Sequence, residues 1–547
     1  MNRRPLAFLL ALLTLWLPVR GIAQAASPTS ESSEMAAADR LFMSGALPEA
    51  AAKYQAIINA DPRSVAAQVG LIRIYLIQQK VDEALATLNA ALALIPNDPL
   101  LLLTQGDVQF RLGKISDAER SYIKAENLNP KDPAPYLGLT RVYRSYSLYR
   151  HASDEMNRAR EIAPNDMAVQ LLWLQSLPWQ ARIAAIQAYL AGPGAQNPQA
   201  AKPMQQYLYF LQHNPDPAAQ HSCRLASNVE ETNTKLLAVP RAGMQLGASG
   251  LAVKLNKEEL HLAVDTGASG ILLGRTAAEK AGVKRLAYRP VAGMGDAGEQ
   301  GGYTAVADQI RIGDLEFQDC VVRVTDSATP VTGLDGLIGT DVFSSYLIDI
   351  DIPGAKLKLS PLPKRPDEAA APASLKTTPE EAPEVDPASP AASLPKDAYV
   401  APEMANWTKV YRFKQILLVP TLVDQTGPVL FMIDTGSFSN VLSTRAAREV
   451  TQIRSDPATQ VSGLSGSVAK VYRADKAALQ FGRYEQQNQD IVTFDLSAVC
   501  KTTGTEVSGI LGFAMLRILQ IKIDYRDGLV DFLYDPHHLP KGMRIGK

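Results

Sequence analysis

The C-terminal half of the chain contains two copies of one unit. Asp265-Thr266-Gly267 follows a short apolar run, and Asp434-Thr435-Gly436 follows another, 169 residues later. Further on, Gly336-Leu337-Ile338-Gly339 is matched by Gly509-Ile510-Leu511-Gly512, now 173 residues apart. Because both motifs recur in the same order at nearly one spacing, this half is a tandem duplication with small insertions. Two such units in tandem predict two similar lobes.

Each motif has a physical reason. The short apolar runs before the two Asp residues are typical of buried strands, so each carboxylate is expected where a strand ends. Gly267 and Gly436 permit the tight turn that presents it. Gly339 and Gly512 each follow two aliphatic residues, and glycine suits a place where two backbones approach closely.

The duplicated unit resembles the lobe of aspartic proteases, and is closer to retropepsin-like bacterial members than to pepsin-like enzymes. The resemblance covers residues 235–362 (lobe 1) and 403–536 (lobe 2), and it implies that Asp265 and Asp434 form a catalytic pair. It also implies that the two threonines hydrogen-bond across the active-site loops. The residues expected to support these loops are Thr266, Gly267, Thr435, Gly436, Ile338, Gly339, Leu511 and Gly512. It places flaps at Gly293–Tyr303 and Gly463–Tyr472, with Gly293, Gly295, Gly463 and Gly466 as flap candidates. Phe438 departs from the family pattern, which usually has a small polar residue there.

Two acids in one site have a predictable chemistry. At about 3 Å and an effective dielectric constant near 20, two carboxylates repel by roughly 5 kcal/mol. The pair therefore holds one proton. The ionised member can take a proton from water while the protonated member polarises a peptide carbonyl. The sequence leaves open which Asp carries the proton.

A helical repeat precedes the duplication. Prolines recur every 34 residues, and so do small alanines; these are Pro62, Pro96, Pro130 and Pro164, and Ala50, Ala84, Ala118 and Ala152. The period and the residue types resemble the tetratricopeptide repeat. We expect an all-α array with capping helices over residues 31–212. Two roles stay open for this array: it forms a groove for a protein partner, or it is a spacer that braces the rest of the chain.

The N-terminus predicts export. Arg3 and Arg4 precede an apolar run over residues 6–19, which is short for a membrane span, and Ala23-Gln24-Ala25 has the pattern of a cleavage site. Residues 1–25 are therefore predicted to be a signal peptide, with an uncleaved anchor as the alternative. The protein is expected in the periplasm or outside the cell. The pairing of its three cysteines stays open.

The two lobes are joined by a segment rich in Pro, Ala, Glu and Ser, residues 363–402. That composition predicts disorder. A linker of this length permits one chain to close its own site or two chains to exchange lobes. We favour the single-chain site, because the duplication supplies both acids in one chain.

Charge and the remaining motifs exclude several classes of partner and cofactor. The chain has 55 basic and 56 acidic residues, which disfavours a nucleic-acid partner. Gly293, Gly295 and Gly298 spell a dinucleotide motif without the required helix after it. The pair His537-His538 has no other metal ligand at a suitable spacing. We therefore predict neither cofactor nor metal, and no integral membrane span after signal removal.

Together these features predict a multidomain protein, an all-α tetratricopeptide-repeat solenoid followed by a mostly-β, two-lobed domain like an aspartic protease. The predicted function is an exported aspartic endopeptidase that hydrolyses peptide bonds through a water activated by Asp265 and Asp434. The repeats would recruit a protein substrate or partner. The alternative is a peptide-binding protein whose lobes are catalytically silent.

Overall fold

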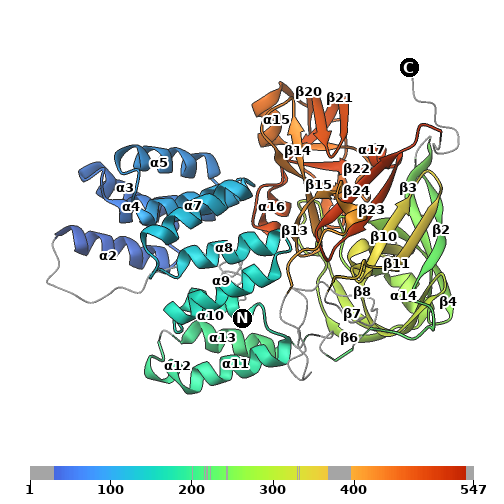
Figure 1. Cartoon of the computed structure of the whole chain (residues 1–547), viewed down its shortest axis with the longest axis horizontal. Coiled ribbons are helices and arrows are strands. Elements are labelled where there is room, and N and C mark those ends of the chain that lie inside the picture. Colours follow the sequence, from blue (N-terminus) through green and yellow to red (C-terminus); the bar gives the residue numbers. More distant parts are fainter. Residues whose placement is uncertain are drawn as a thin grey trace.

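The structure is a computed structural model, and it describes residues 30–199, 201–214, 216, 220–221, 223–241, 244–328, 331, 333–366 and 396–537. A helical array is followed by two β-rich lobes that lie beside it (Figure 1). The predicted signal peptide, residues 1–25, and linker residues 367–395 lie outside the described residues.

Paired helices form the array. They are α2 (Ser30–Met43), α3 (Leu47–Ala60), α4 (Val65–Ile77), α5 (Val81–Leu94), α6 (Pro99–Arg111), α7 (Ile115–Leu128), α8 (Ala134–Ser145), α9 (Tyr149–Ile162), α10 (Met167–Leu174), α11 (Trp179–Ala191), α12 (Pro193–Gln196) and α13 (Lys202–His213). The prolines of the repeat lie two residues after the ends of α3, α5, α7 and α9, because proline lacks an N–H and its ring clashes with the preceding turn. Asp98 and Asp166 begin α6 and α10, each accepting two backbone hydrogen bonds.

Tyr122 of α7 fills the centre of the array. It is fully buried between Gly106 of α6 and Gly138 of α8, where its ring leaves no room for a Cβ. Its hydroxyl donates to Asp107 (2.9 Å), which also accepts from Arg141 (2.8 Å). Small residues thus let the helices approach closely, and the buried hydroxyl keeps a partner.

The two lobes repeat one order of elements. Lobe 1 contains β1 (Arg224–Leu225), β2 (Thr232–Arg241), β3 (Met244–Leu255), β4 (Glu258–Asp265), β5 (Ile271–Gly274), α14 (Arg275–Ala281), β6 (Lys284–Tyr288), β7 (Gly302–Ile312), β8 (Leu315–Thr325), β9 (Gly336–Gly339), η2 (Thr340–Phe343), β10 (Tyr346–Asp351) and β11 (Lys356–Pro361). Lobe 2 contains η3 (Pro402–Met404), β12 (Thr408–Lys409), β13 (Tyr411–Phe413), β14 (Ile416–Val423), β15 (Val429–Asp434), β16 (Val441–Ser443), α15 (Thr444–Val450), β17 (Ile453–Ser455), β18 (Ser462–Gly463), β19 (Gly466–Ser467), β20 (Tyr472–Phe481), β21 (Tyr484–Phe494), α16 (Ser497–Thr503), β22 (Gly509–Gly512), α17 (Phe513–Leu516), β23 (Leu519–Asp524) and β24 (Leu529–Tyr534). In lobe 1, β9 pairs parallel with β4 and antiparallel with β5, and β22 pairs in the same way with β15 and β16 in lobe 2.

One sheet joins the lobes. Strand β10 of lobe 1 pairs antiparallel with β23 of lobe 2, with Ile348 opposite Ile523. The sheet runs β12-β24-β23-β10-β11-β2 and continues into lobe 1. Both isoleucines belong to a core cluster that draws buried residues from both lobes. The lobes are therefore held together by main-chain hydrogen bonds and a continuous apolar core.

Lobe 2 packs against the middle of the array. Phe110 of α6 meets the edge of Phe413 in β13, with ring centroids 6.1 Å apart, and Tyr146 lies 5.4 Å from Tyr411. The Thr505 hydroxyl donates to the Phe110 carbonyl (2.6 Å). Helices α6 and α8 also pack against neighbouring helices, so most of their residues are buried. The array thus braces lobe 2, one of the two roles that the sequence left open.

Both described ends of the inter-lobe linker are anchored. Arg365 pairs with Asp527 just before β24, and the same carboxylate accepts from the Tyr399 N–H (3.0 Å). Asp397 contacts the start of α9 through Arg150 (3.2 Å) and His151 (2.7 Å). The described ends of the segment predicted to be disordered, 363–402, thus make specific contacts. Charged and aromatic residues there make specific contacts that composition does not reveal.

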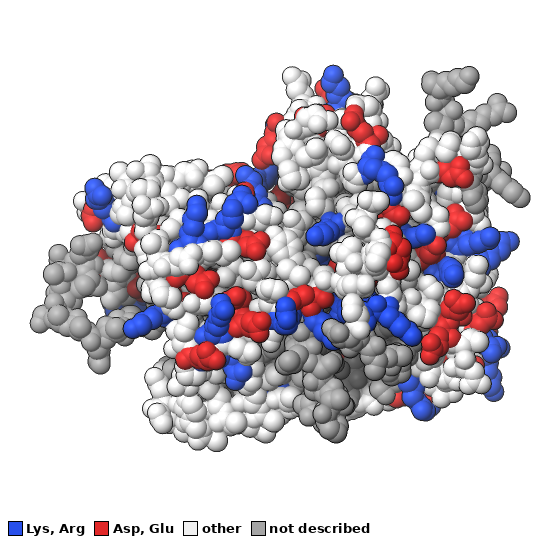
Figure 2. All heavy atoms as spheres, in the orientation of Figure 1, with Lys and Arg blue, Asp and Glu red and all other residues white. Residues whose placement is uncertain are grey.

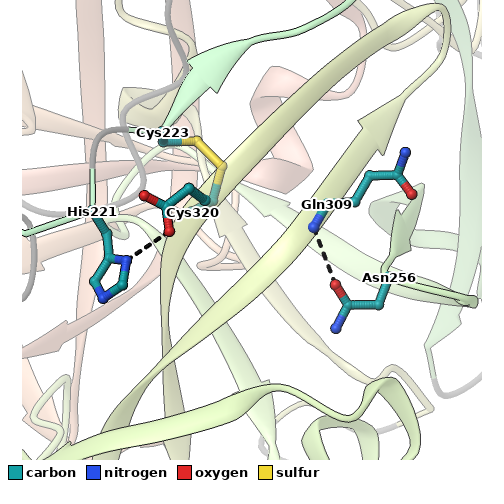
Figure 3. Close-up of a disulfide and its surroundings, with 6 residues drawn as sticks. His221, Cys223, Asn256, Gln309 and Cys320 are labelled. Carbon is teal, nitrogen blue, oxygen red and sulfur yellow. Dashed lines mark hydrogen bonds and ion pairs between the residues drawn. A yellow bond between two sulfur atoms is a disulfide. The ribbon is translucent and has the colours of Figure 1, made fainter.

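A disulfide joins Cys223 to Cys320, which lies on β8 (Figure 3). It ties the segment after the array to lobe 1 across 97 residues of sequence. Beside it, His221 Nδ1 lies 2.6 Å from Asp319 Oδ1. Cys500 is free.

The surface charge is mixed. Basic and acidic side chains are interspersed over both the array and the lobes on the face shown in Figure 2. Among the described residues, no helix combines the length and apolar character needed to cross a membrane.

Removing the contact between the array and lobe 2 should lower the free energy of unfolding by a measurable amount. Phe110→Ala should lower the free energy of unfolding by about 3 kcal/mol, because it empties a buried aromatic contact. Leu128→Ala, at a side chain 53% exposed, should change it by about 0.5 kcal/mol or less. Chemical unfolding measures both. Equal effects would contradict a packed interface.

The disulfide should stabilise the fold by constraining the unfolded chain. Cys223→Ser with Cys320→Ser should lower the free energy of unfolding by about 2–5 kcal/mol. A reducing agent should lower the melting temperature of the wild-type protein and leave that of the double variant unchanged. If the agent shifted both melting temperatures alike, the effect would not come from this bridge.

Candidate active site

The two Asp-Thr-Gly motifs lie at the ends of equivalent strands. Asp265 ends β4 and lies opposite Gly339 of β9, whereas Asp434 ends β15 and lies opposite Gly512 of β22. The neighbouring Ile338 and Leu511 are fully buried. At Gly512 a Cβ would clash with the backbone of Ser439, so the close strand pairing that supports the loop requires glycine.

Four hydrogen bonds lock the two loops together. Each threonine hydroxyl accepts from the N–H of the other threonine, at 3.0 Å in both directions. The Thr266 hydroxyl donates to the Ile433 carbonyl (2.9 Å), and the Thr435 hydroxyl donates to the Val264 carbonyl (2.8 Å). Each threonine thus bonds to the backbone of the other lobe, which fixes the distance and orientation of the two loops.

The lock brings the two carboxylates face to face. A Cβ on Gly267 would lie 2.7 Å from the Asp434 Cγ, and a Cβ on Gly436 would likewise collide with the Asp265 carboxylate. Asp265 Oδ1 accepts from the Gly267 N–H (2.8 Å). Asp434 Oδ1 accepts from two N–H groups, those of Gly436 (2.9 Å) and Ser437 (3.1 Å). The glycines therefore leave space for the opposite acid and also donate to their own.

Burial raises the pKa of both acids, and repulsion between them adds to the increase at Asp265 alone. Burial is the main cause at Asp265, and the neighbouring charge of Asp434 adds to it, so the Asp265 pKa lies well above the usual range. Burial also raises the pKa of Asp434, but the N–H groups of Ser437 and Gly436 oppose the increase. An arrangement of this kind retains one proton and can donate and accept protons at once.

The two glycine-rich hairpins touch each other. Ser465, between β18 and β19, is buried; its N–H donates to the Met294 carbonyl (2.9 Å), and its carbonyl accepts from the Ala297 N–H (2.8 Å). Its hydroxyl accepts from the Gly293 N–H (3.0 Å). Gly295 lies so close to this turn that a Cβ would meet its carbonyls. The structure thus brings the four flap candidates, Gly293, Gly295, Gly463 and Gly466, into one contact between the lobes.

Two segments of the chain, residues 251–342 and 419–515, match the family model described as aspartyl protease. Residues 41–105 match the tetratricopeptide repeat model. This chain carries two aspartyl protease domains and a tetratricopeptide repeat. The resemblance and the fold class predicted from the sequence are thereby confirmed. A search of curated proteins found no match.

Two solved structures align with the chain at low similarity. The crystal structure of an aspartic proteinase from Irpex lacteus aligns at 10% identity with a TM-score of 0.34, over 56% of this chain and 98% of its own. A thermophilic tetratricopeptide protein of Thermus thermophilus aligns at 18% identity with a TM-score of 0.28, over 34% of this chain and 100% of its own.

Sequence reasoning missed several residues around the aspartyl protease loops. Asn440 accepts from the Gly512 N–H (2.9 Å) and donates to Gln486, and Asp341 holds the other loop. Ser465 ties the hairpins. Comparison of the two copies offered a signal, because Asp341 lies two residues after the first Gly-x-x-Gly motif and the second copy has Ala514 at the matching position. Phe438 keeps its loop in place through its carbonyl, which accepts from the Ala514 N–H (2.7 Å).

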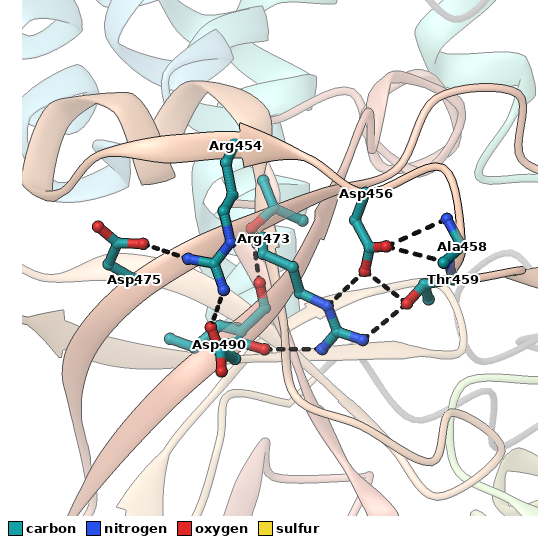
Figure 4. A network of polar contacts seen from close by, with 9 residues as sticks. Arg454, Asp456, Ala458, Thr459, Arg473, Asp475 and Asp490 are labelled. Atoms are coloured by element: carbon teal, nitrogen blue, oxygen red, sulfur yellow. Dashed lines mark hydrogen bonds and ion pairs between the residues drawn. The ribbon is translucent and has the colours of Figure 1, made fainter.

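A polar cavity of about 390 Å³ lies on β17, β20 and β21 of the second aspartyl protease domain. Its arginines are already engaged: Arg454 pairs with Asp475 and Asp490, and Arg473 pairs with Asp456 (Figure 4). The cavity therefore offers no unpaired charge for an anion. No group of three or more acidic, His or Cys side chains in the described part of the chain is placed to hold a metal.

The raised pKa values predict a cost in stability. Between pH about 4 and the raised pKa values, the folded protein binds more protons than the unfolded chain, so stability falls as the pH rises through this window. Asp265→Asn and Asp434→Asn should therefore raise stability at neutral pH by on the order of 1 kcal/mol. The gain should vanish near pH 3. Thermal unfolding across pH measures it, with the exposed Asp154→Asn as the control. A gain independent of pH would contradict this origin.

Proposed function

We propose that this protein is an exported aspartic endopeptidase with Asp265 and Asp434 as its catalytic residues. The observation that carries the proposal is the pair of facing carboxylates with raised pKa values, locked by the threonines of both lobes. A peptide-binding protein has no chemical need for two acids held in this way.

The reaction follows from the shared proton. The ionised Asp takes a proton from water, whose oxygen attacks the carbonyl carbon of the peptide bond. The protonated Asp donates to the carbonyl oxygen, which gives a neutral tetrahedral intermediate. The Asp that took the proton from water then gives it to the amide nitrogen, while the other Asp takes a proton from one hydroxyl of the intermediate; the C–N bond breaks and releases an amine and a carboxylic acid. The buried loops strengthen these interactions because bulk water does not screen them.

Substrate is proposed to enter between the hairpins. Their mutual hydrogen bonds through Ser465 would break when a peptide enters and would be replaced by bonds to the peptide backbone. Both lobes of one chain supply the acids, the threonines and the shared sheet, which supports the single-chain site over an exchange of lobes between two chains.

The array is proposed to have two roles. Its central helices, α6 and α8, contact lobe 2, and tetratricopeptide repeats in general bind proteins. We assign recruitment of a protein substrate or partner to helices outside that contact. Export is supported by the basic and apolar character of residues 1–25 and by the disulfide, because such bonds persist in oxidising compartments.

Peptide cleavage tests the function directly. The full mature chain should cleave members of a mixed peptide library, and Asp265→Asn or Asp434→Asn should each reduce kcat by about 10³-fold or more. Asp154→Asn should behave as wild type. Cleavage products identified by mass spectrometry across acidic to neutral pH give the readout. Equal turnover by all variants would reject the pair, and peptide binding without turnover would favour the catalytically silent alternative.

A further inference from the structure

The duplication allows each residue near one acid to be compared with its counterpart near the other. At the 173-residue spacing that relates Gly339 to Gly512, Thr340 corresponds to Phe513, and Asp341 corresponds to Ala514. The first copy therefore places two polar residues after its glycine where the second copy places two apolar ones. All four side chains are buried or half-buried, so this difference lies inside the protein.

Asp341 holds the loop that carries Asp265. Its Oδ2 accepts from the Ser269 hydroxyl (2.8 Å), and its Oδ1 accepts from the Gly270 N–H (2.9 Å). The carboxylate lies against Gly339, the strand partner of Asp265, so closely that a Cβ on the glycine would meet it. Asp341 is only 7% exposed. A carboxylate is thus fixed one strand away from Asp265.

The loop that carries Asp434 is held by neutral groups. The Phe513 and Ala514 N–H groups donate to the Ser437 and Phe438 carbonyls, both at 2.7 Å. Asn440, whose side chain braces this loop by accepting from the Gly512 N–H, is a neutral amide. The two half-sites therefore have similar geometry and different electrostatics.

A second polar contact supports the first half-site from across the lobes. The Tyr525 hydroxyl, from the turn before β24, lies 2.8 Å from the Thr340 hydroxyl. Tyr525 is fully buried, and its counterpart in the first copy is the apolar Ile352. Two cations also lie nearby, because Arg323 donates to the Ser269 carbonyl (2.9 Å) and Arg412 donates to the Tyr525 carbonyl (3.0 Å).

We propose that Asp341 is a positioning residue for Asp265, and that its fixed carboxylate makes Asp265 the member of the pair that holds the shared proton. This inference rests on the proposed peptidase function and deepens it. The charge of Asp341 opposes a second negative charge on the neighbouring Asp265. Asp434 accepts from two N–H groups, which favour its ionised form, so the negative charge resides there.

The groups that face Asp265 from the surrounding elements agree with this assignment. Asp434 and Asp341 are acidic, and Tyr525 is a neutral phenol whose pKa is raised. Arg323 and Arg412 are cations of this region, and they donate to the backbone carbonyls of Ser269 and Tyr525. Burial raises the Asp341 pKa, and the charges of the two arginines oppose that increase because they favour the ionised form of Asp341. Asp434 therefore takes the proton from water, and Asp265 donates its proton to the peptide carbonyl.

Two substitutions separate the charge of Asp341 from its hydrogen bonds. Asp341→Asn keeps both contacts, because the amide oxygen accepts from Gly270 and the amide NH₂ donates to Ser269. It removes the charge, so the alkaline limb of the kcat/KM profile should move to lower pH by about 0.5 units or more. Asp341→Leu removes both contacts and should lower kcat by about 10²-fold, with little change in KM.

Two further variants complete the experiment. Ser269→Ala removes one contact without changing any charge, so kcat should fall while the pH profile keeps its position. If Asp341→Leu does not fold, Ser269→Ala still tests the positioning role. Asp349→Asn is the matched control, because Asp349 is a partly buried carboxylate bound to Gln520 (2.8 and 2.9 Å) in the shared sheet. Its pH profile should equal that of the wild-type protein.

The outcomes are distinct. An unshifted profile in Asp341→Asn would overturn the assignment of the proton. Wild-type kcat in both Asp341→Leu and Ser269→Ala would overturn the positioning role. If the wild-type protein cleaved no peptide, the proposed function would fail, and this inference would fail with it.

Discussion

Reciprocal hydrogen bonding between Thr266 and Thr435 is the constraint on which the site depends. Two carboxylates in a poorly hydrated space repel each other, and they stay together only if the surrounding structure holds them. Each threonine bonds to the backbone of the opposite loop, so neither loop can move alone. Burial raises the pKa of both acids, and at Asp265 the neighbouring charge of Asp434 adds to the increase.

The rest of the fold supplies the rigidity that such a lock needs. The pairing of β10 with β23 joins the lobes by main-chain hydrogen bonds. The array packs against lobe 2 through the contact of Phe110 with Phe413. The Cys223–Cys320 disulfide joins the segment after the array to lobe 1. The array is thus attached to lobe 2 by packing, and the segment that follows the array is attached to lobe 1 by the disulfide.

Duplication produced two half-sites that share geometry and differ in charge. The glycine and threonine positions are equivalent because both halves must make the same turn and the same lock. Asp341 and Tyr525 have the apolar counterparts Ala514 and Ile352, because only one acid of a pair that shares a proton needs to stay protonated. A symmetric site would leave the proton equally on either acid, whereas this asymmetry gives each acid one role.

The sequence alone determined the order of the parts, the repeat length, and the two Asp-Thr-Gly loops, because these depend on local patterns that recur at a constant spacing. It did not reveal the contact of Phe110 with Phe413, the anchoring of Asp397 on α9, the Cys223–Cys320 bridge, or the Ser465 contact between the hairpins. Those contacts join residues far apart in the chain, and no local periodicity encodes which distant surfaces meet. Only the tertiary structure decided them, because they depend on how the two lobes and the array pack once each has formed.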